Sequence, residues 1–85
     1  MVDGADWIAR STGPRQIDRY VGARIRTARE RQATSVEDLA AAVGSSISLI
    51  AGYEDGLEKV SPAMLCRIAV TLDVTLGSLF GMNAI

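Results

Sequence analysis

Histidine is absent from this 85-residue sequence, and cysteine occurs only once. The sequence also lacks any close grouping of carboxylates on a predicted helical face, so most acid–base, nucleophilic and metal-assisted chemistry has no side chains to use. We therefore expect no enzymatic activity, no metal site and no cofactor. Because Cys66 stands alone, no internal disulfide can form, which favours a reduced, cytoplasmic setting. Its apolar helical surroundings predict a small core residue.

Long apolar runs are missing as well. No stretch approaches the roughly 18 apolar residues that a membrane-spanning helix needs, and the first residues lack the apolar core of a signal peptide. We expect a soluble protein with no membrane partner. A chain of this length forms one domain with a modest core, which an oligomer would help to stabilise.

Basic residues are scarce beyond the first third of the chain. Residues 1–32 hold seven arginines and four acidic residues, a net charge of +3, whereas residues 33–85 hold two basic and six acidic residues, a net charge of −4. These two values sum to the −1 of the whole chain. Any basic surface must therefore come from the N-terminal third.

The chain divides into a leader and one domain. Residues 1–15 contain glycine, proline and small polar residues without helical periodicity, which predicts a flexible leader; Trp7 either anchors it or is incidental. Residues 16–85 form the predicted domain. It opens with a helix over about 17–32, whose apolar stripe consists of Ile17, Val21, Ile25 and Ala28.

The domain is organised around residues 35–54, SVEDLAAAVGSSISLIAGYE. Ser35 and Asp38 form a capping-box pattern that predicts a helix over about 36–43, and Gly44 ends it in the left-handed conformation. Ser45 or Ser46 can cap a second helix over about 46–54. So tight a connection predicts a helix-turn-helix motif, whose second helix can lie in the DNA major groove.

An ion pair is expected to hold this second helix. Its spacing places Ile47, Ile50 and Glu54 on an inward face, with Ser48, Leu49, Gly52 and Tyr53 opposite or beside it. Arg29 stands at the border of the first helix's apolar stripe and needs an acceptor there. We therefore predict a structural, bidentate ion pair between Arg29 and Glu54. Of the other arginines on the first helix, Arg24 and Arg31 share one flank, and Arg19 and Arg26 share the other.

Two more predicted helices complete an all-α fold. Ser61 and Pro62 predict a helix start, and Thr75 can cap a short last helix. The apolar residues from there to the end outnumber what a short surface element should expose. We predict that they make a homodimer contact, the alternative being that the last helix closes its own core; the residues are Leu76, Leu79, Phe80, Met82 and Ile85.

From about Ile17 to Phe80 the sequence resembles the XRE family of helix-turn-helix regulators, which includes the lambda-type repressors. The resemblance rests on VGARIRTARE, SVEDLAAAVG, ISLIAGYEDG and SPAMLCRIAVTLDVTLGSLF. It implies a compact, five-helix, lambda-repressor-like domain and sequence-specific operator binding as a homodimer. The family commonly has glutamine at the position of Val36, and polar base-reading residues at the positions of Ser48, Leu49 and Gly52.

Two functions remain open on these residues. The first is a DNA-binding transcriptional regulator, in which serines and helix amides meet phosphates, Leu49 contacts a thymine methyl group, and basic residues supply charge. Its DNA-contacting set is Arg24, Arg31, Val36, Ser45, Ser46, Ser48, Leu49, Gly52 and Lys59. The second is a protein-interaction module that binds a partner through a neutral surface of Leu49, Gly52 and Tyr53.

Overall fold

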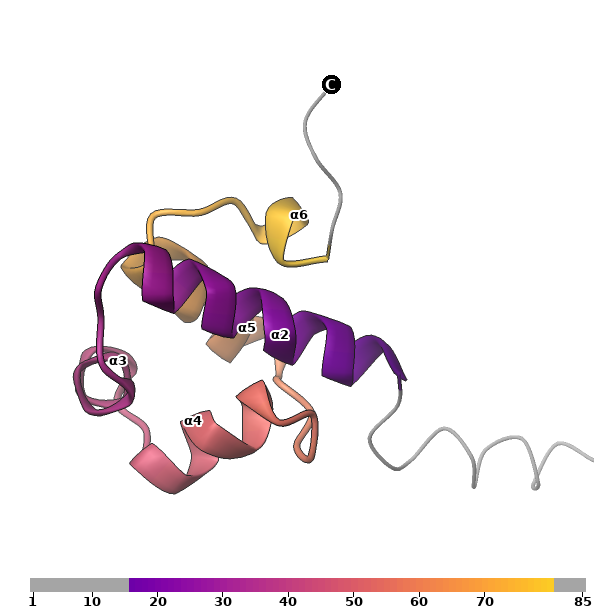
Figure 1. Cartoon of the computed structure of the whole chain (residues 1–85), viewed down its shortest axis with the longest axis horizontal. Coiled ribbons are helices and arrows are strands. Elements are labelled where there is room, and N and C mark those ends of the chain that lie inside the picture. Colours follow the sequence, from indigo (N-terminus) through magenta and orange to yellow (C-terminus); the bar gives the residue numbers. More distant parts are fainter. Residues whose placement is uncertain (1–15, 81–85) are drawn as a thin grey trace, which may run out of the picture.

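Five helices make up residues 16–80, the part of the chain that the computed structural model describes (Figure 1). They are α2 (Gln16–Arg31), α3 (Val36–Val43), α4 (Ile47–Glu54), α5 (Pro62–Thr71) and α6 (Leu76–Leu79). No strand occurs among these residues, so the predicted all-α, five-helix fold is confirmed. The leader with Trp7, and Met82 and Ile85 near the other end, lie outside the described residues.

Local hydrogen bonds explain where four of the five helices begin, α3 to α6. Ser35, Ser46, Ser61 and Thr75 each precede a helix in extended backbone conformation. Each side-chain oxygen accepts a hydrogen bond from the amide three residues later, at distances of 3.0, 3.0, 3.2 and 3.1 Å in that order. A cap of this kind contributes about 1 kcal/mol, because it satisfies an amide that has no partner inside the helix.

All five helices enclose the core: α2 packs against α4 and α6, and α3 and α5 pack against each other, α3 also against α4 and α5 also against α6. Each helix contributes one of the core's largest fully buried side chains, and Leu72, directly after α5, contributes another. These residues are Ile25, Leu39, Ile50, Ile68, Leu72 and Leu79. Among residues 16–80 no polar or charged residue is fully buried. None of the described helices combines the length and the apolar character that crossing a membrane requires.

Three residues lie elsewhere than their sequence pattern predicts. Cys66 is exposed, because the buried stripe of α5 runs through Leu65, Ile68 and Ala69 and leaves Cys66 on its outer flank. Ile17 is half exposed at the first turn of α2, beyond the edge of the core. Leu79 is only 1% exposed.

The burial of Leu79 corrects its predicted role as a dimer contact. Helix α6 is a single turn that packs against α2 and α5, so only one of its bulky apolar side chains can enter the core. Leu79 takes that place and closes the core, whereas Leu76 and Phe80 remain 39% and 40% exposed. The exposed apolar surface of α6 is therefore smaller than the sequence indicates.

Helices α4 and α6 pack on different sides of α2 (Figure 1). The contact between α2 and α4 is unusually close at Gly22, where an added β-carbon would overlap the carbonyl oxygen of Tyr53. The two backbones therefore approach without a side chain between them, which only glycine permits. This contact fixes the position of α4.

Candidate nucleic-acid interface

A three-residue connection sets the angle between α3 and α4. Gly44 has φ +71° and ψ +38°, the left-handed conformation that ends a helix. Its amide lies 3.3 Å from the carbonyl oxygen of Ala41, and the amide of Ser45 donates to the carbonyl of Ala40 at 2.8 Å. These bonds satisfy the last carbonyls of α3, and Ser46 caps α4 immediately afterwards. Local hydrogen bonds thus form the turn of the helix-turn-helix.

The inward face of α4 differs from the predicted one. Ile50 and Tyr53 are buried, and Leu49 is half-buried against the core. Ile47, predicted to face inward, is 50% exposed. Side chains lean toward the N-terminus of their helix, and Ile47 is the first residue of α4, so its side chain extends past the core edge.

The outward face of α4 is therefore formed by Ile47 and Ser48, which are exposed, and by Ala51, which is half-buried. We call these three residues the open stripe. It contains no charged side chain and none of the amide or guanidinium groups that pair bidentately with base edges. The neutral surface predicted from Leu49, Gly52 and Tyr53 does not form, because Tyr53 is buried.

Gly52 is covered by the loop that follows α4. A β-carbon there would lie 2.9 Å from Cγ of Glu58, and the carbonyl of Gly52 accepts hydrogen bonds from the amides of Leu57 and Glu58. Gly52 is therefore turned toward this loop rather than open to a DNA groove. Burial, and secondarily the charge of Glu58, raises the pKa of the neighbouring Tyr53.

The structure brings Arg29 and Glu54 together. Arg29 donates from Nε to Oε2 of Glu54 at 2.7 Å and from Nη2 to Oε1 at 3.0 Å. A third bond runs from Nη1 to the carbonyl of Thr34 at 2.9 Å. The two side chains are 12% and 5% exposed. The pair thus ties α2 to the end of α4 and to the loop before α3, and the hydrogen bond to Glu54 raises the pKa of Arg29.

The other arginines of α2 divide between its two sides. Nε of Arg26 lies 4.0 Å from Oε1 of Glu54, and the stem of Arg19 packs over Gly56 just after α4. Arg24 donates to the carbonyl of Ser78 instead, and Arg31 lines the same cavity beside α6. Arg24 and Arg31, predicted to contact DNA, are therefore placed away from α4.

The remaining predicted contacts have unequal access to solvent. The hydroxyl oxygen of Ser45 is buried and has no hydrogen-bond partner among the described residues, so it cannot reach a phosphate. Val36 is half-buried against the core. Ser46 and Lys59 are exposed beside α4. The sequence analysis did not identify Ile47 as an exposed residue of α4, or Arg19 and Arg26 of α2 as the arginines that lie near α4. The lean of helical side chains could have identified Ile47, but nothing local shows which flank of α2 faces α4.

Among residues 16–80 there is no group of three or more histidine, cysteine or acidic side chains that could hold a metal ion. Between Ala33 and Glu58 the chain carries five acidic residues and no basic one. One of the five, Glu54, is neutralised by Arg29. The basic residues nearest to α4 are therefore Arg19 and Arg26 on α2 and Lys59 in the loop that follows α4. Arg26 also lies 3.9 Å from a carboxylate oxygen of Glu30.

Comparisons with known proteins agree with this geometry. A family model described as a helix-turn-helix domain matches residues 21–79. The restriction-modification controller protein C.AhdI from Aeromonas hydrophila has 31% sequence identity and a TM-score of 0.70; the match covers 73% of this chain and 94% of that one. The comparison with curated proteins gave no match.

Two further solved structures are similar. SinR, a master regulator for biofilm formation solved in complex with DNA, has 28% identity and a TM-score of 0.66; the match covers 69% of this chain and 95% of that one. The clp gene regulator ClgR from Corynebacterium glutamicum has 20% identity and a TM-score of 0.75, over 80% of this chain and 88% of that one, and shows a likeness of fold. These are regulators and not enzymes.

Proposed function

Because the chain belongs to the helix-turn-helix domain family, of the XRE type, we propose that it is a transcription regulator that binds duplex DNA through α4 as a homodimer. A fold alone does not decide a function, so the proposal has to rest on the site. The observation that carries it is the division of α4 into two faces. One face is fixed to α2 by the Gly22 contact and the Arg29–Glu54 pair, and the open stripe faces solvent.

The open stripe offers few base contacts. Ile47 takes the role predicted for Leu49 and contacts a thymine methyl group, while the hydroxyl groups of Ser46 and Ser48 donate to phosphate oxygens. The first amides of α4 point the same way, and their partial positive charge favours a phosphate. Specificity should be modest, since an apolar contact discriminates among bases less than a bidentate hydrogen-bonded pair does.

Phosphate contacts then dominate the affinity. Arg19, Arg26 and Lys59 lie around the far end of α4 and supply the cations. With about two to four phosphate contacts per subunit, the slope of log K against log salt is roughly −4 to −7 for a dimer, since each neutralised phosphate contributes about 0.9. Anisotropy of a labelled duplex over a salt series measures this slope.

One variant in α4, one variant in α2 and one control in α5 test the proposed DNA interface. Ile47→Ala should erode the preference among duplexes, and Arg19→Gln should weaken binding to every duplex alike. Arg67→Gln, on the exposed side of α5, should change neither. If Ile47→Ala and Arg19→Gln both bind as the unaltered protein does, α4 is not the DNA-binding helix.

The alternative is that the open stripe binds a protein. One observation favours it: the stripe has no basic side chain, and the acidic Asp55 and Glu58 follow it closely. Such a module would retain no duplex even at low salt, while Ile47→Glu would abolish capture of its partner. Saturable, salt-dependent DNA binding that Ile47→Ala alters excludes this alternative.

The homodimer is proposed from the exposed Leu76 and Phe80 of the α6 region. For two copies of α4 to enter successive major grooves, a two-fold interface there has to set them about 34 Å apart. In sedimentation at micromolar concentration, Leu76→Glu should give a folded monomer. Leu57→Glu, which changes an exposed leucine in the loop after α4, should leave the dimer intact. A monomer before any substitution contradicts the proposal.

A further inference from the structure

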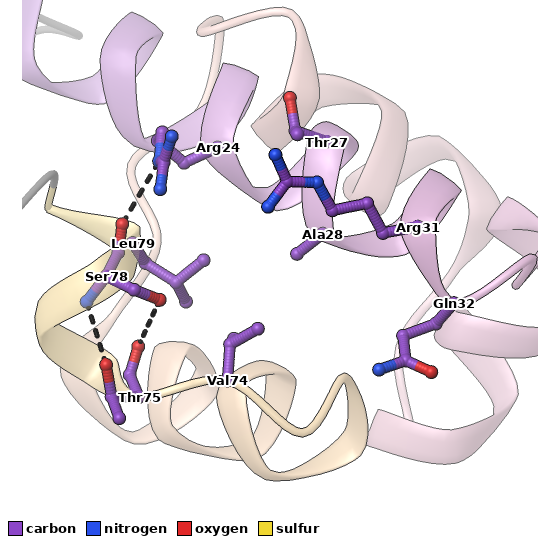
Figure 2. Close-up of a pocket in the computed structure, with 9 residues that line it drawn as sticks. All are labelled: Arg24, Thr27, Ala28, Arg31, Gln32, Val74, Thr75, Ser78 and Leu79. Carbon is purple, nitrogen blue, oxygen red and sulfur yellow. Dashed lines mark hydrogen bonds between the residues drawn. The ribbon is translucent and has the colours of Figure 1, made fainter. Parts of the chain in front are cut away.

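A cavity of about 340 Å³ lies between the C-terminal half of α2 and the segment that leads into α6 (Figure 2). It is separate from the proposed DNA-binding face, because α6 and α4 pack on different sides of α2 (Figure 1). Arg24, Thr27, Ala28 and Arg31 reach it from α2, since positions i, i+3, i+4 and i+7 share one helical face. Val74 and Leu79 form part of the opposite wall.

The charged side chains that line this cavity are both cationic. Figure 2 shows the guanidinium groups of Arg24 and Arg31 over the same side of the opening. No acidic side chain is among the described residues that line the cavity. The Nε group of Arg24 donates to the carbonyl of Ser78 at 3.1 Å, which holds this arginine in place and leaves its two terminal nitrogens as donors. Two neighbouring cations without a counter-charge repel each other, so an anion between them is favourable.

The neighbouring hydroxyl groups are mostly engaged within the protein. Thr27 donates to the carbonyl of Ala23 at 3.0 Å, and Ser78 donates to the carbonyl of Thr75 at 2.9 Å. Oγ1 of Thr75 accepts from the amide of Ser78, which leaves its hydrogen available to a ligand. The side-chain amide of Gln32 donates to the carbonyl of Leu72 at 3.2 Å and keeps a second N–H. The hydrogen-bond donors that remain are therefore the guanidinium groups, one hydroxyl and one amide N–H, a set that selects an acceptor-rich group.

The rest of the wall is apolar, from Ala28, Val74 and the buried Leu79. A cavity of this size is at the lower end of the range for small-molecule sites. We propose that it binds a small organic anion, whose single phosphate or carboxylate group pairs with Arg24 and Arg31 and whose compact apolar part lies against Ala28 and Val74. Both oxyanions match the planar fork of a guanidinium group.

Such a ligand joins α2 to the α6 region. It binds the folded protein and not the unfolded chain, so it stabilises the fold in proportion to its concentration above Kd. The site is independent of DNA binding, and its test uses no DNA. A protein that binds no anion here could still bind DNA through α4, and a protein that binds no DNA could still bind an anion in this cavity.

The test is a nuclear magnetic resonance titration of the full chain at constant ionic strength. The probes are phenyl phosphate and benzoate, with benzyl alcohol as the uncharged control. A few charge-assisted hydrogen bonds correspond to an affinity on the order of 1 mM, so titrations should extend to about 20 mM. We expect saturable shifts of amides in α2 and α6 with at least one anion and none with benzyl alcohol. The tighter of the two anions identifies phosphate or carboxylate as the preferred group.

Arg31→Gln is the informative variant because Arg31 is exposed, so its loss should not disturb folding. We expect it to weaken anion binding at least about tenfold, which corresponds to about 1.4 kcal/mol. Arg67→Gln, which removes the same charge from α5, should leave the affinity within about twofold of the unaltered value, since Arg67 is not among the residues that line the cavity. The proposal is overturned if neither anion saturates, if benzyl alcohol binds as well, or if Arg31→Gln and Arg67→Gln weaken binding equally.

Discussion

Replacing Arg29 by methionine should be the most damaging single change to the α2–α4 contact. Methionine keeps the length and much of the apolar stem but removes all three hydrogen bonds of the guanidinium group. The carboxylate of Glu54 would then lose both of its bonds from Arg29 while only 5% exposed, with Arg26 Nε no closer than 4.0 Å. The carbonyl of Thr34 would lose its bond from Arg29 as well.

The magnitude follows from burial. Removing one partner of a buried ion pair costs about 3–5 kcal/mol, because an uncompensated charge remains. Residues 16–80 have an expected free energy of unfolding of about 3–10 kcal/mol, at about 0.05–0.15 kcal/mol per residue. Arg29→Met should therefore leave the domain marginally folded. Glu54→Gln should cost less, about 1–3 kcal/mol, because the amide oxygen still accepts from Arg29 and the Thr34 bond survives.

Urea denaturation followed by far-ultraviolet circular dichroism measures these losses. With a slope near 1 kcal/mol per molar, Arg29→Met should lower the midpoint by about 3 M or more. In the double variant no buried charge remains, so its loss should be smaller than the sum of the single losses by at least about 1 kcal/mol. If Arg29→Met does not fold, Glu54→Gln and the double variant still decide. The reasoning is refuted if each single variant loses less than about 0.5 kcal/mol of unfolding free energy. It is also refuted if the loss of the double variant equals the sum of the two single losses.

Three further outcomes are expected. Gly22→Ala should cost about 3 kcal/mol in urea denaturation, since its β-carbon would overlap the carbonyl of Tyr53; a loss below about 1 kcal/mol would show that α2 and α4 can separate without cost. Gly44→Ala should cost only about 1–2 kcal/mol, because the space there is empty and only the positive φ is unfavourable; a larger loss would indicate a steric contact. The raised pKa of Tyr53 means that the folded state holds this proton more tightly than the unfolded state, so stability should fall as pH rises above about 10. Tyr53→Phe should reduce that alkaline loss, whereas Tyr20→Phe, at an exposed position, should not; equal curves for the two variants contradict the burial argument.

Features set by neighbouring residues were predictable from the sequence. The bounds of α3 and α4 follow from Ser35, Gly44 and Ser46, because a cap or a left-handed glycine acts within a few residues. The pairing of Arg29 with Glu54 was also accessible, since each stood on a predicted inward face and only one acceptor suited the arginine.

Features that depend on how whole helices are packed were not predictable in the same way. Helical spacing places Ile47 in line with Ile50 but does not show where the core ends, so Ile47 was assigned to the wrong side. The flank of α2 that faces α4 depends on the rotation of α2 about its axis, and the Gly22 contact sets that rotation. For this reason the sequence could not show that Arg24 and Arg31, which are predicted to contact DNA, lie beside α6.

The contact at Gly22 also bears on how readily α4 could be given a new recognition sequence. What fixes α4 lies on its inner side, at Gly22 and Tyr53, whereas Ile47, Ser48 and Ala51 take no part in that attachment. Glutamine and arginine form helices at least as readily as isoleucine and serine do, so polar readers could replace the outward residues without displacing the helix. Under the proposed function, base preference could then be changed by selecting outward residues from a small library while the architecture is retained.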